Sequence, residues 1–234
     1  MTGPTSYVPA QVVAAWNETA TFRGIELQLP PAAAAAHRRP GQIVKVRTGV
    51  GEGFFALATA PVGSQAELLV KRGHRIADAV VALAVPGRPL EVTPPFGAGF
   101  PIEDAVGRDV LLFAAGSGIA PIRGLIQHVI AHREDFGRAT LFYGQRRGAD
   151  FAYLGEHLAW ERQGVRVVLC PSQEDDAWTG VRGRVQEVAR SLAFGGAPPS
   201  DSVAFVVGMT AMVDDVKRTL AAAGVPAGRV HLNF

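Results

Sequence analysis

The second half of the chain alternates short apolar runs with helical patterns, and this rhythm limits the possible fold more than any other feature. Apolar runs typical of buried strands lie at 110–114, 139–143, 165–169, 203–207 and 230–232. An amphipathic helical pattern follows each of the first four runs. Because strands that alternate with helices form a parallel sheet covered on both faces, the pattern predicts a doubly wound α/β domain that binds its ligand beyond the strand ends.

The first hundred residues show a different pattern, that of short antiparallel strands. Residues 42–48 alternate apolar and polar side chains, and the short runs at 54–60, 67–72 and 89–100 are bounded by glycine or proline turns. Strands this short and this closely spaced predict an antiparallel β-barrel, with one helix near 76–83. The change of pattern near 102–108 predicts two domains, residues 1–104 and 105–234.

Composition excludes several classes of protein. With 234 residues, 48% of them hydrophobic, the chain is long enough for two domains with apolar cores. The net charge of +2, without a basic run interleaved with aromatics, argues against nucleic-acid binding. A single cysteine, Cys170, cannot form an intrachain disulfide or hold an iron–sulfur cluster alone, and the six histidines lack metal-ligand spacing, so no metal site is expected. No segment predicts a membrane span or signal peptide, and we expect a cytoplasmic protein.

The strongest local signal is the glycine turn after the strand at 110–114. Gly116 and Gly118 permit a close ligand approach, and Pro121 suits the first turn of the following helix. Free N–H groups and the helix dipole at such a turn favour a phosphate. Pro121 replaces the third glycine of the usual dinucleotide fingerprint, so a tight strand-to-helix turn without a ligand stays an alternative.

Several motifs along the chain resemble those of the ferredoxin–NADP reductase superfamily, in the family's order. They are Pro40-Gly41-Gln42, Phe55-Ala56-Leu57-Ala58-Thr59, Leu69-Val70-Lys71, Pro95-Phe96-Gly97-Ala98-Gly99-Phe100, Gly116-Ser117-Gly118-Ile119-Ala120-Pro121, Tyr143-Gly144-Gln145-Arg146 and Val207-Gly208-Met209-Thr210-Ala211-Met212. The segment from Ser172 to Trp178 is most similar to members of the "fruit protein" kind. The resemblance implies an FAD-binding barrel followed by an NAD(P)-binding α/β domain.

The resemblance also assigns residues to the two cofactors. The expected flavin-binding residues are Phe55, Ala56, Leu57, Ala58, Thr59, Val70, Lys71, His74, Arg75, Ile76 and Ala77. The expected nucleotide-binding residues are Gly116, Ser117, Gly118, Ile119, Pro121, Tyr143, Gly144, Arg146, Ser172, Gln173, Gly208, Met209 and Met212. Ala56 stands at the position nearest the reacting flavin nitrogen, and Phe234 ends the chain either as an aromatic lid over the flavin or as the end of the last strand.

Three positions depart from the family's pattern. Where the family has an Arg for the flavin pyrophosphate, a stacking Tyr and a Ser, this chain has Gly53, Phe55 and Ala56. Phe55 can still stack on a ring, and Lys71 or Arg75 could neutralise the pyrophosphate. The alternative is a barrel that has lost its flavin.

The loop after the strand at 165–169 bears on the choice of nucleotide. Ser172 is followed by Gln173 and an acidic run at 174–176, which would accept hydrogen bonds from a ribose diol and repel a 2′-phosphate. This favours NADH, although Arg182 and Arg184 could reverse the preference and the run could simply be a solvated loop. Cys170, at the end of an apolar strand, is expected to be a packing residue rather than a nucleophile.

Together these observations predict an FAD-dependent NAD(P)H reductase. Hydride would pass from nicotinamide to FAD, and electrons would then leave to an acceptor protein or small molecule, while the oligomeric state stays open. One alternative is a flavin-free nucleotide-binding or regulatory subunit of a larger redox complex. Another is a dehydrogenase with its own substrate pocket, which the absence of an evident catalytic His, Lys or Tyr constellation disfavours.

Overall fold

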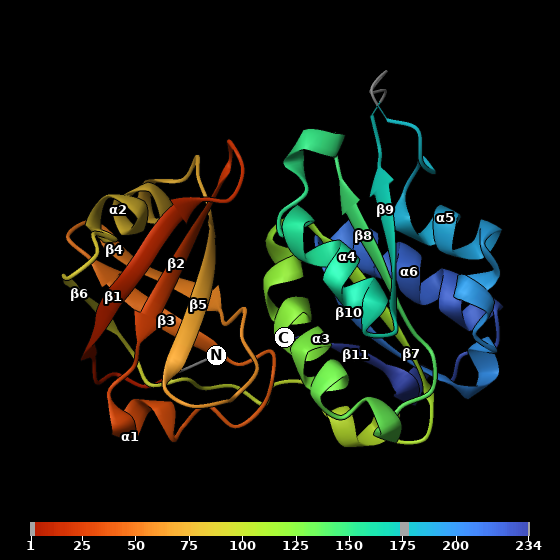
Figure 1. Cartoon of the computed structure of the whole chain (residues 1–234), viewed down its shortest axis with the longest axis horizontal. Helices are drawn as coiled ribbons and strands as arrows, with labels where there is room; N and C mark the ends of the chain where they lie inside the picture. Colours follow the sequence, from red (N-terminus) through yellow and green to blue (C-terminus); the bar gives the residue numbers. More distant parts are fainter. Residues whose placement is uncertain (1–2, 174–177, 234) are drawn as a thin grey trace.

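Two β-sheets of different kinds stand side by side in the molecule, each with its own helices (Figure 1). The computed structural model describes residues 3–173 and 178–233. The first sheet is antiparallel and the second is parallel. The fold class predicted from the sequence, a barrel followed by an α/β domain, is confirmed.

The barrel is a six-stranded sheet in the order β4-β3-β6-β1-β2-β5. Its strands are β1 (Val8–Asn17), β2 (Phe22–Gln28), β3 (Ile43–Thr48), β4 (Gly51–Ala56), β5 (Gln65–Lys71) and β6 (Pro89–Val92). The two edges meet just after β4, where Leu57 and Leu68 form an antiparallel bridge. This bridge closes the sheet at one end, as a barrel requires.

The barrel holds its own apolar core, and a helix covers one opening. Inward-facing residues such as Ile25, Leu27 and Leu68 are fully buried, as strand alternation requires. Helix α2 (Arg75–Leu83) contributes Ala77 and Val80 to this core, while α1 (Pro31–Ala34) is a single turn.

The parallel sheet has the order β11-β10-β7-β8-β9. Its strands are β7 (Asp109–Ala115), β8 (Ala139–Gln145), β9 (Val165–Pro171), β10 (Ser202–Val207) and β11 (Val230–Leu232). The chain runs outward from β7 through β8 to β9, then returns to β10 on the other side of β7. The strand order therefore reverses between β7 and β10, and ligands of open α/β sheets bind at such a switch point.

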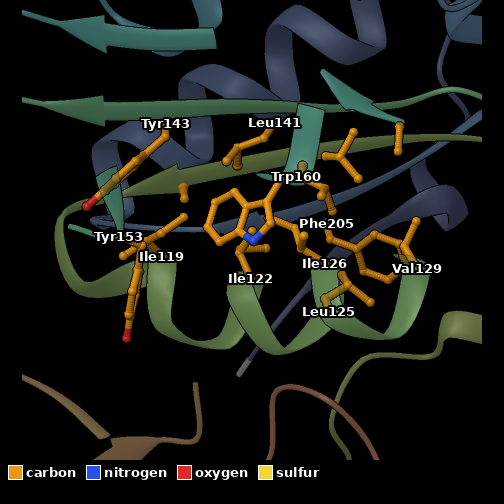
Figure 2. Packing of buried hydrophobic residues seen from close by; sticks show 14 of the residues in the cluster. Ile119, Ile122, Leu125, Ile126, Val129, Leu141, Tyr143, Tyr153, Trp160 and Phe205 are labelled. Carbon is orange, nitrogen blue, oxygen red and sulfur yellow. The ribbon is translucent and has the colours of Figure 1, made fainter. Parts of the chain in front are cut away.

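Helices cover both faces of the parallel sheet. The helices are α3 (Ile119–Ala131), α4 (Leu154–Arg162), α5 (Val185–Ser191) and α6 (Thr210–Ala222). Figure 2 shows the apolar side of α3 packed beneath the strands, with Trp160 of α4 and Phe205 of β10 among its neighbours. Helices α5 and α6 build a second core on the opposite face.

The two domains share apolar packing where they meet. Phe22, Ala58 and Leu69 of the barrel belong to the same buried cluster as α3 and β10. A segment that includes the single turn Ile102–Ala105 joins the domains; a division between 104 and 105 would fall inside that turn and stays a prediction. Within residues 3–173 and 178–233, no helix has the length and apolarity needed to cross a bilayer.

Candidate functional site

A cleft of about 1020 Å³ lies between the two domains and is lined by both. Its barrel wall consists of Thr21, Phe22, Phe54, Phe55, Ala56, Leu69 and Lys71. Its α/β wall includes the glycine turn 115–118, Ala120 and Pro121, the ends of β8 and β9, the start of α5, and residues 207–209 with Ala211, Met212 and Asp215. Because binding pockets of roughly 300–1,000 Å³ accommodate small ligands and cofactors, this cleft is the candidate site.

The glycine turn occupies the cleft at the switch point of the sheet. Gly116 adopts a left-handed backbone with φ of +58°, and a Cβ placed there would meet nothing within 4 Å. Gly118 differs, since a Cβ there would lie 2.5 Å from the carbonyl oxygen of Val207 at the end of β10. Gly116 therefore leaves room on the cleft side, whereas Gly118 allows β10 to approach the turn.

Tyr143 supports this turn from behind. Its hydroxyl lies 3.3 Å from the carbonyl oxygen of Gly116, to which it donates, and accepts a hydrogen bond of 2.7 Å from Nε2 of Gln145. The side chain is fully buried, and burial raises the pKa of the Tyr143 hydroxyl above its usual value. Tyr143 thus holds the turn in place and does not line the cleft.

The barrel wall presents aromatic rings to the cleft. Phe54 is 56% exposed, and Phe55 is half-buried beside Ala56 at the end of β4. A Cβ at Gly53 would lie 2.9 Å from Phe55 Cε2 and 3.0 Å from Ile76 Cγ2. Phe55 and Ile76 therefore fill the space that the Cβ of a larger residue at position 53 would need.

Several cations in the cleft make no ion pair within the described part of the chain. Lys71, Arg146 and Arg147 line it, and none makes an ion pair with any of the residues that the structure describes. By contrast, Arg184 lies 3.8 Å from Asp215. Unpaired cations in a cleft attract anionic ligands such as phosphates.

The loop after β9 is anchored to the end of β8. The backbone N–H of Ser172 donates to the carbonyl of Gln145 over 2.9 Å, and that of Gln173 donates to the carbonyl of Arg146 over 2.9 Å. Both side chains stay exposed and line the cleft. The acidic run at 174–176, on which the expected NADH preference rested, lies outside the described residues.

The structure brings together many of the residues expected from the sequence. Those that line the cleft are Phe55, Ala56, Lys71, Gly116, Ser117, Gly118, Pro121, Gly144, Arg146, Ser172, Gln173, Gly208, Met209 and Met212. Their roles toward cofactors stay predictions.

Other expected residues lie outside the cleft lining. They are Leu57, Ala58, Thr59, Val70, His74, Arg75, Ile76, Ala77, Ile119 and Tyr143. The side chains of Leu57, Ala58 and Val70 are fully buried in the apolar cores. Phe234 lies outside the described residues, although Asn233 before it approaches Gly41 of the barrel.

Sequence reasoning missed further residues of the cleft. Among them are Thr21, Phe22, Phe54, Leu69, Arg147, Asp150, Gly183, Val185, Gln186 and Asp215. Three of them carried a signal: Leu69 belongs to the recognised motif Leu69-Val70-Lys71, and Arg147 and Phe54 flank recognised motifs. The others lie in or just before β2 and α5, in α6, and in the turn Gly148–Asp150, and they reach the cleft through tertiary packing.

Cys170 lies at the back of the cleft as a packing residue. Its side chain is 1% exposed, and burial raises the pKa of the thiol to about 12. A thiol held in this protonated form is a poor nucleophile, in agreement with the role expected from the sequence.

Comparisons with known proteins point to one family. Residues 112–218 match the family described as "Oxidoreductase NAD-binding domain". The chain is 32% identical over 155 residues to sulfhydrogenase 1 subunit gamma of Pyrococcus furiosus, covering 64% of this chain and 52% of that protein. It is 29% identical to the ferredoxin reductase component of 3-ketosteroid-9-alpha-monooxygenase of Rhodococcus rhodochrous, covering 94% and 62% respectively.

The plant relative expected from the loop sequence is also present. Fruit protein pKIWI502 of Actinidia deliciosa is 26% identical, over 82% of this chain and 64% of its own length. The chain thus spans between about half and two thirds of the length of these three relatives.

Solved structures support the fold over the whole chain. A ferredoxin NADP+ reductase from Neisseria gonorrhoeae superposes with a TM-score of 0.82 at 16% identity, covering 99% of this chain and all of that one. The superposition covers both the barrel and the parallel sheet. Residues 112–218 thus match the oxidoreductase NAD-binding family, and the chain as a whole has the two-domain fold of a ferredoxin–NADP reductase.

Proposed function

We propose that this protein is an FAD-dependent NAD(P)H reductase. One observation carries the proposal: the aromatic end of β4 and the glycine turn after β7, which lie in different domains, face the same cleft. A two-cofactor reaction needs its two rings to meet, and a cleft shared by both domains allows this. When bound, FAD would accept a hydride from the nicotinamide, which is chemistry that the cofactors themselves supply.

The residues on the α/β side fit a dinucleotide. The open space above Gly116, at a turn that leads into α3, leaves room for a phosphate beside backbone N–H groups. Arg146 and Arg147 add two cations to the same cleft, and neither pairs with a carboxylate of residues 3–173 or 178–233. Gly208 and the 76% exposed Met209 would leave access for the nicotinamide.

The residues on the barrel side fit a flavin. Phe54, Phe55 and Leu69 supply an apolar wall against which a planar ring can pack. Lys71 adds a cation at the end of β5. Since the position of Gly53 is closed by Phe55 and Ile76, we propose that Lys71 takes over the charge that the family places on its missing arginine.

The acceptor is proposed from the relatives alone. The relative from Rhodococcus rhodochrous is named as the ferredoxin reductase component of a monooxygenase, and a relative from Mycolicibacterium smegmatis is named as the reductase component of another. We propose a separate acceptor protein or small molecule as the electron outlet, and action in the cytoplasm. The NADH preference stays a prediction.

The visible spectrum of the purified protein tests the proposal. We expect a yellow protein, or one that gains a flavin spectrum on incubation with FAD, and we expect anaerobic addition of NADH or NADPH to bleach that spectrum. Comparing the bleaching rates with the two nucleotides gives their preference. A protein that takes up no flavin would contradict the proposal and favour the flavin-free alternative.

A further inference from the structure

Two carboxylates of the barrel contact the α/β domain, Glu67 from a buried position and Glu18 from a half-buried one. Glu67 of β5 accepts a hydrogen bond of 2.8 Å from the hydroxyl of Tyr153 and lies 3.1 Å from Nη1 of Arg123. Glu18, after β1, accepts a hydrogen bond of 2.5 Å from the backbone N–H of Tyr153. The side chains of Arg123 and Glu67 are 12% and 9% exposed, so this polar contact lies inside the joint between the domains.

Arg123 is the centre of this cluster. Its Nη1 donates to the carbonyl oxygen of Ala58 over 2.8 Å, and its Nε and Nη2 lie within 3.1 Å of the carboxylate of Glu156. The guanidinium also lies over the ring of Tyr153, 4.7 Å from its centroid. Figure 2 shows the Tyr153 hydroxyl pointing away from the sheet.

The partners of Arg123 connect both walls of the cleft. Arg123 belongs to α3, the helix that begins directly after the glycine turn. Ala58 lies two residues after Ala56, which is the last residue of β4 and part of the barrel wall. A short, buried path therefore joins the expected nucleotide turn to the expected flavin strand.

The same side of α3 makes two more contacts with this part of the barrel. A Cβ at Gly124 would lie 2.7 Å from the carbonyl oxygen of Thr59, so only a glycine permits the observed approach. The side chain of Gln127 accepts a hydrogen bond of 2.8 Å from the backbone N–H of Ala60. Together with the Arg123 contacts, they hold α3 in a fixed position relative to residues 58–60.

We propose that Arg123, Glu67 and Tyr153 form an interdomain clamp. These positioning residues would fix the glycine turn, expected to bind the nicotinamide nucleotide, relative to β4 and the residues after it, expected to bind the flavin. The inference rests on the proposed function, since it concerns how the two cofactor sites are aligned. A buried ion pair often adds little net stability compared with apolar side chains, but its directional hydrogen bonds select one geometry. In a reaction that depends on ring-to-ring distance, displacement of about 1 Å can cost about 100-fold in rate.

A triple variant, Arg123→Met/Glu67→Met/Tyr153→Phe, tests the clamp. It replaces the three clamp residues by apolar groups of similar size. The carboxylates that remain, Glu18 and Glu156, are only partly buried and stay in contact with solvent, so we expect the variant to fold and to bind FAD and NADH with affinities near those of the unmodified protein. We expect flavin reduction at saturating NADH to slow by about tenfold or more. The long-wavelength charge-transfer absorbance of the stacked nicotinamide and flavin should weaken.

A second readout needs neither cofactor. The native Cys170 is buried, so spin labels can be directed to cysteines introduced at Leu83 and Leu158, which are exposed residues of the two domains. We expect a narrow distance distribution between the labels in the protein with the clamp and a broad one in the triple variant. If the triple variant does not fold, Tyr153→Phe alone should broaden the distribution to a smaller extent.

The matched control is Arg138→Met/Asp109→Met, which removes an ion pair of 3.3 Å within the α/β domain. We expect this control to keep the narrow distribution, the charge-transfer absorbance and the reduction rate. A triple variant that keeps all three would overturn the clamp while leaving the reductase function intact. An unmodified protein whose bound flavin is not reduced by either nucleotide would instead overturn the proposed function and the clamp with it.

Discussion

At the scale of single residues, the two glycines of the turn after β7 have different reasons to be glycine. The sequence suggested that a side chain at Gly118 would fill the space of a phosphate. In the structure, a Cβ there would meet the backbone of β10, with the Val207 carbonyl oxygen at 2.5 Å. Gly116 is the residue whose missing side chain leaves open space in the cleft, and its φ of +58° disfavours other residues.

Alanine variants of the two glycines should therefore differ in stability and in nucleotide binding. We expect Gly118→Ala to lower the melting temperature strongly, because β10 must move. Gly116→Ala should cost only about 1–2 kcal/mol of backbone strain but weaken nicotinamide binding in the folded protein. Thermal unfolding and NADH titration of both variants check this; equal stability losses would contradict the assignment.

Lys71 is the residue on which flavin binding can be tested most directly. A charge-assisted hydrogen bond contributes about 1.5–3 kcal/mol, so Lys71→Met should weaken FAD binding by about tenfold or more, measured by quenching of flavin fluorescence. Arg88→Met, at an exposed position of the same domain, is the control and should bind FAD normally. Unchanged affinity in Lys71→Met would assign the flavin phosphates to other groups.

At the scale of elements, α3 serves two purposes at once. Its apolar side packs on the parallel sheet through Ile122, Ile126 and Val129, whereas Arg123 and Gln127 face the barrel. The spacing of Arg123 and Gln127, four residues apart, places them on one side of the helix. Because α3 contacts both the parallel sheet and the segment after β4, it fixes the position of that segment relative to the sheet.

Gln127 provides an element-scale prediction. In Gln127→Met the buried N–H of Ala60 loses its acceptor, which should lower the free energy of unfolding by about 1–3 kcal/mol. Gln163→Met, which changes an exposed glutamine at the end of α4, should cost far less. Urea denaturation of the two variants measures the difference, and equal effects would show that the Gln127 contact contributes nothing.

At the scale of the whole molecule, buried histidines should make stability depend on pH. Burial lowers the pKa values of His37 and His157 to about 4. Each group is neutral in the folded protein, so its contribution is fully present above the unfolded pKa near 6.5 and is lost as pH falls toward 4. Glu67 acts in the opposite direction, because burial raises its pKa to about 7 and its contribution is lost as pH rises from about 4.5 to 7.

The variant His157→Phe isolates the contribution of His157 to the pH dependence of stability. His157 lies between Tyr143 and Trp160, so a phenyl ring can take its place. We expect the melting temperature of the variant to fall less than that of the unmodified protein between pH 6.5 and 4. The full effect of one such histidine is on the order of 3 kcal/mol. Parallel pH profiles of the two proteins would contradict the prediction.

Local patterns in the sequence were enough to predict the fold class and the position of most secondary-structure elements. The alternation of apolar runs and helices located every strand of the parallel sheet, and residues 116–121 located the turn at its switch point, because such patterns reflect only neighbouring residues. Strands β1 and β2 were not located, since their runs contain small and polar residues and β1 is interrupted by an irregular register between Val12 and Ala14. Their place in the barrel comes from pairing with distant strands.

Only the tertiary structure decided which residues face the cleft and which support it. Ala58 and Val70 belong to recognised motifs, yet both are buried, because Val70 faces the core of the barrel and Ala58 packs in the cluster that the barrel shares with α3. Glu67 and Arg123 are far apart in the sequence and carried no signal, but the packing of α3 against the barrel brings them to 3.1 Å. Contacts between domains depend on the placement of both, and no local pattern in the chain encodes that placement.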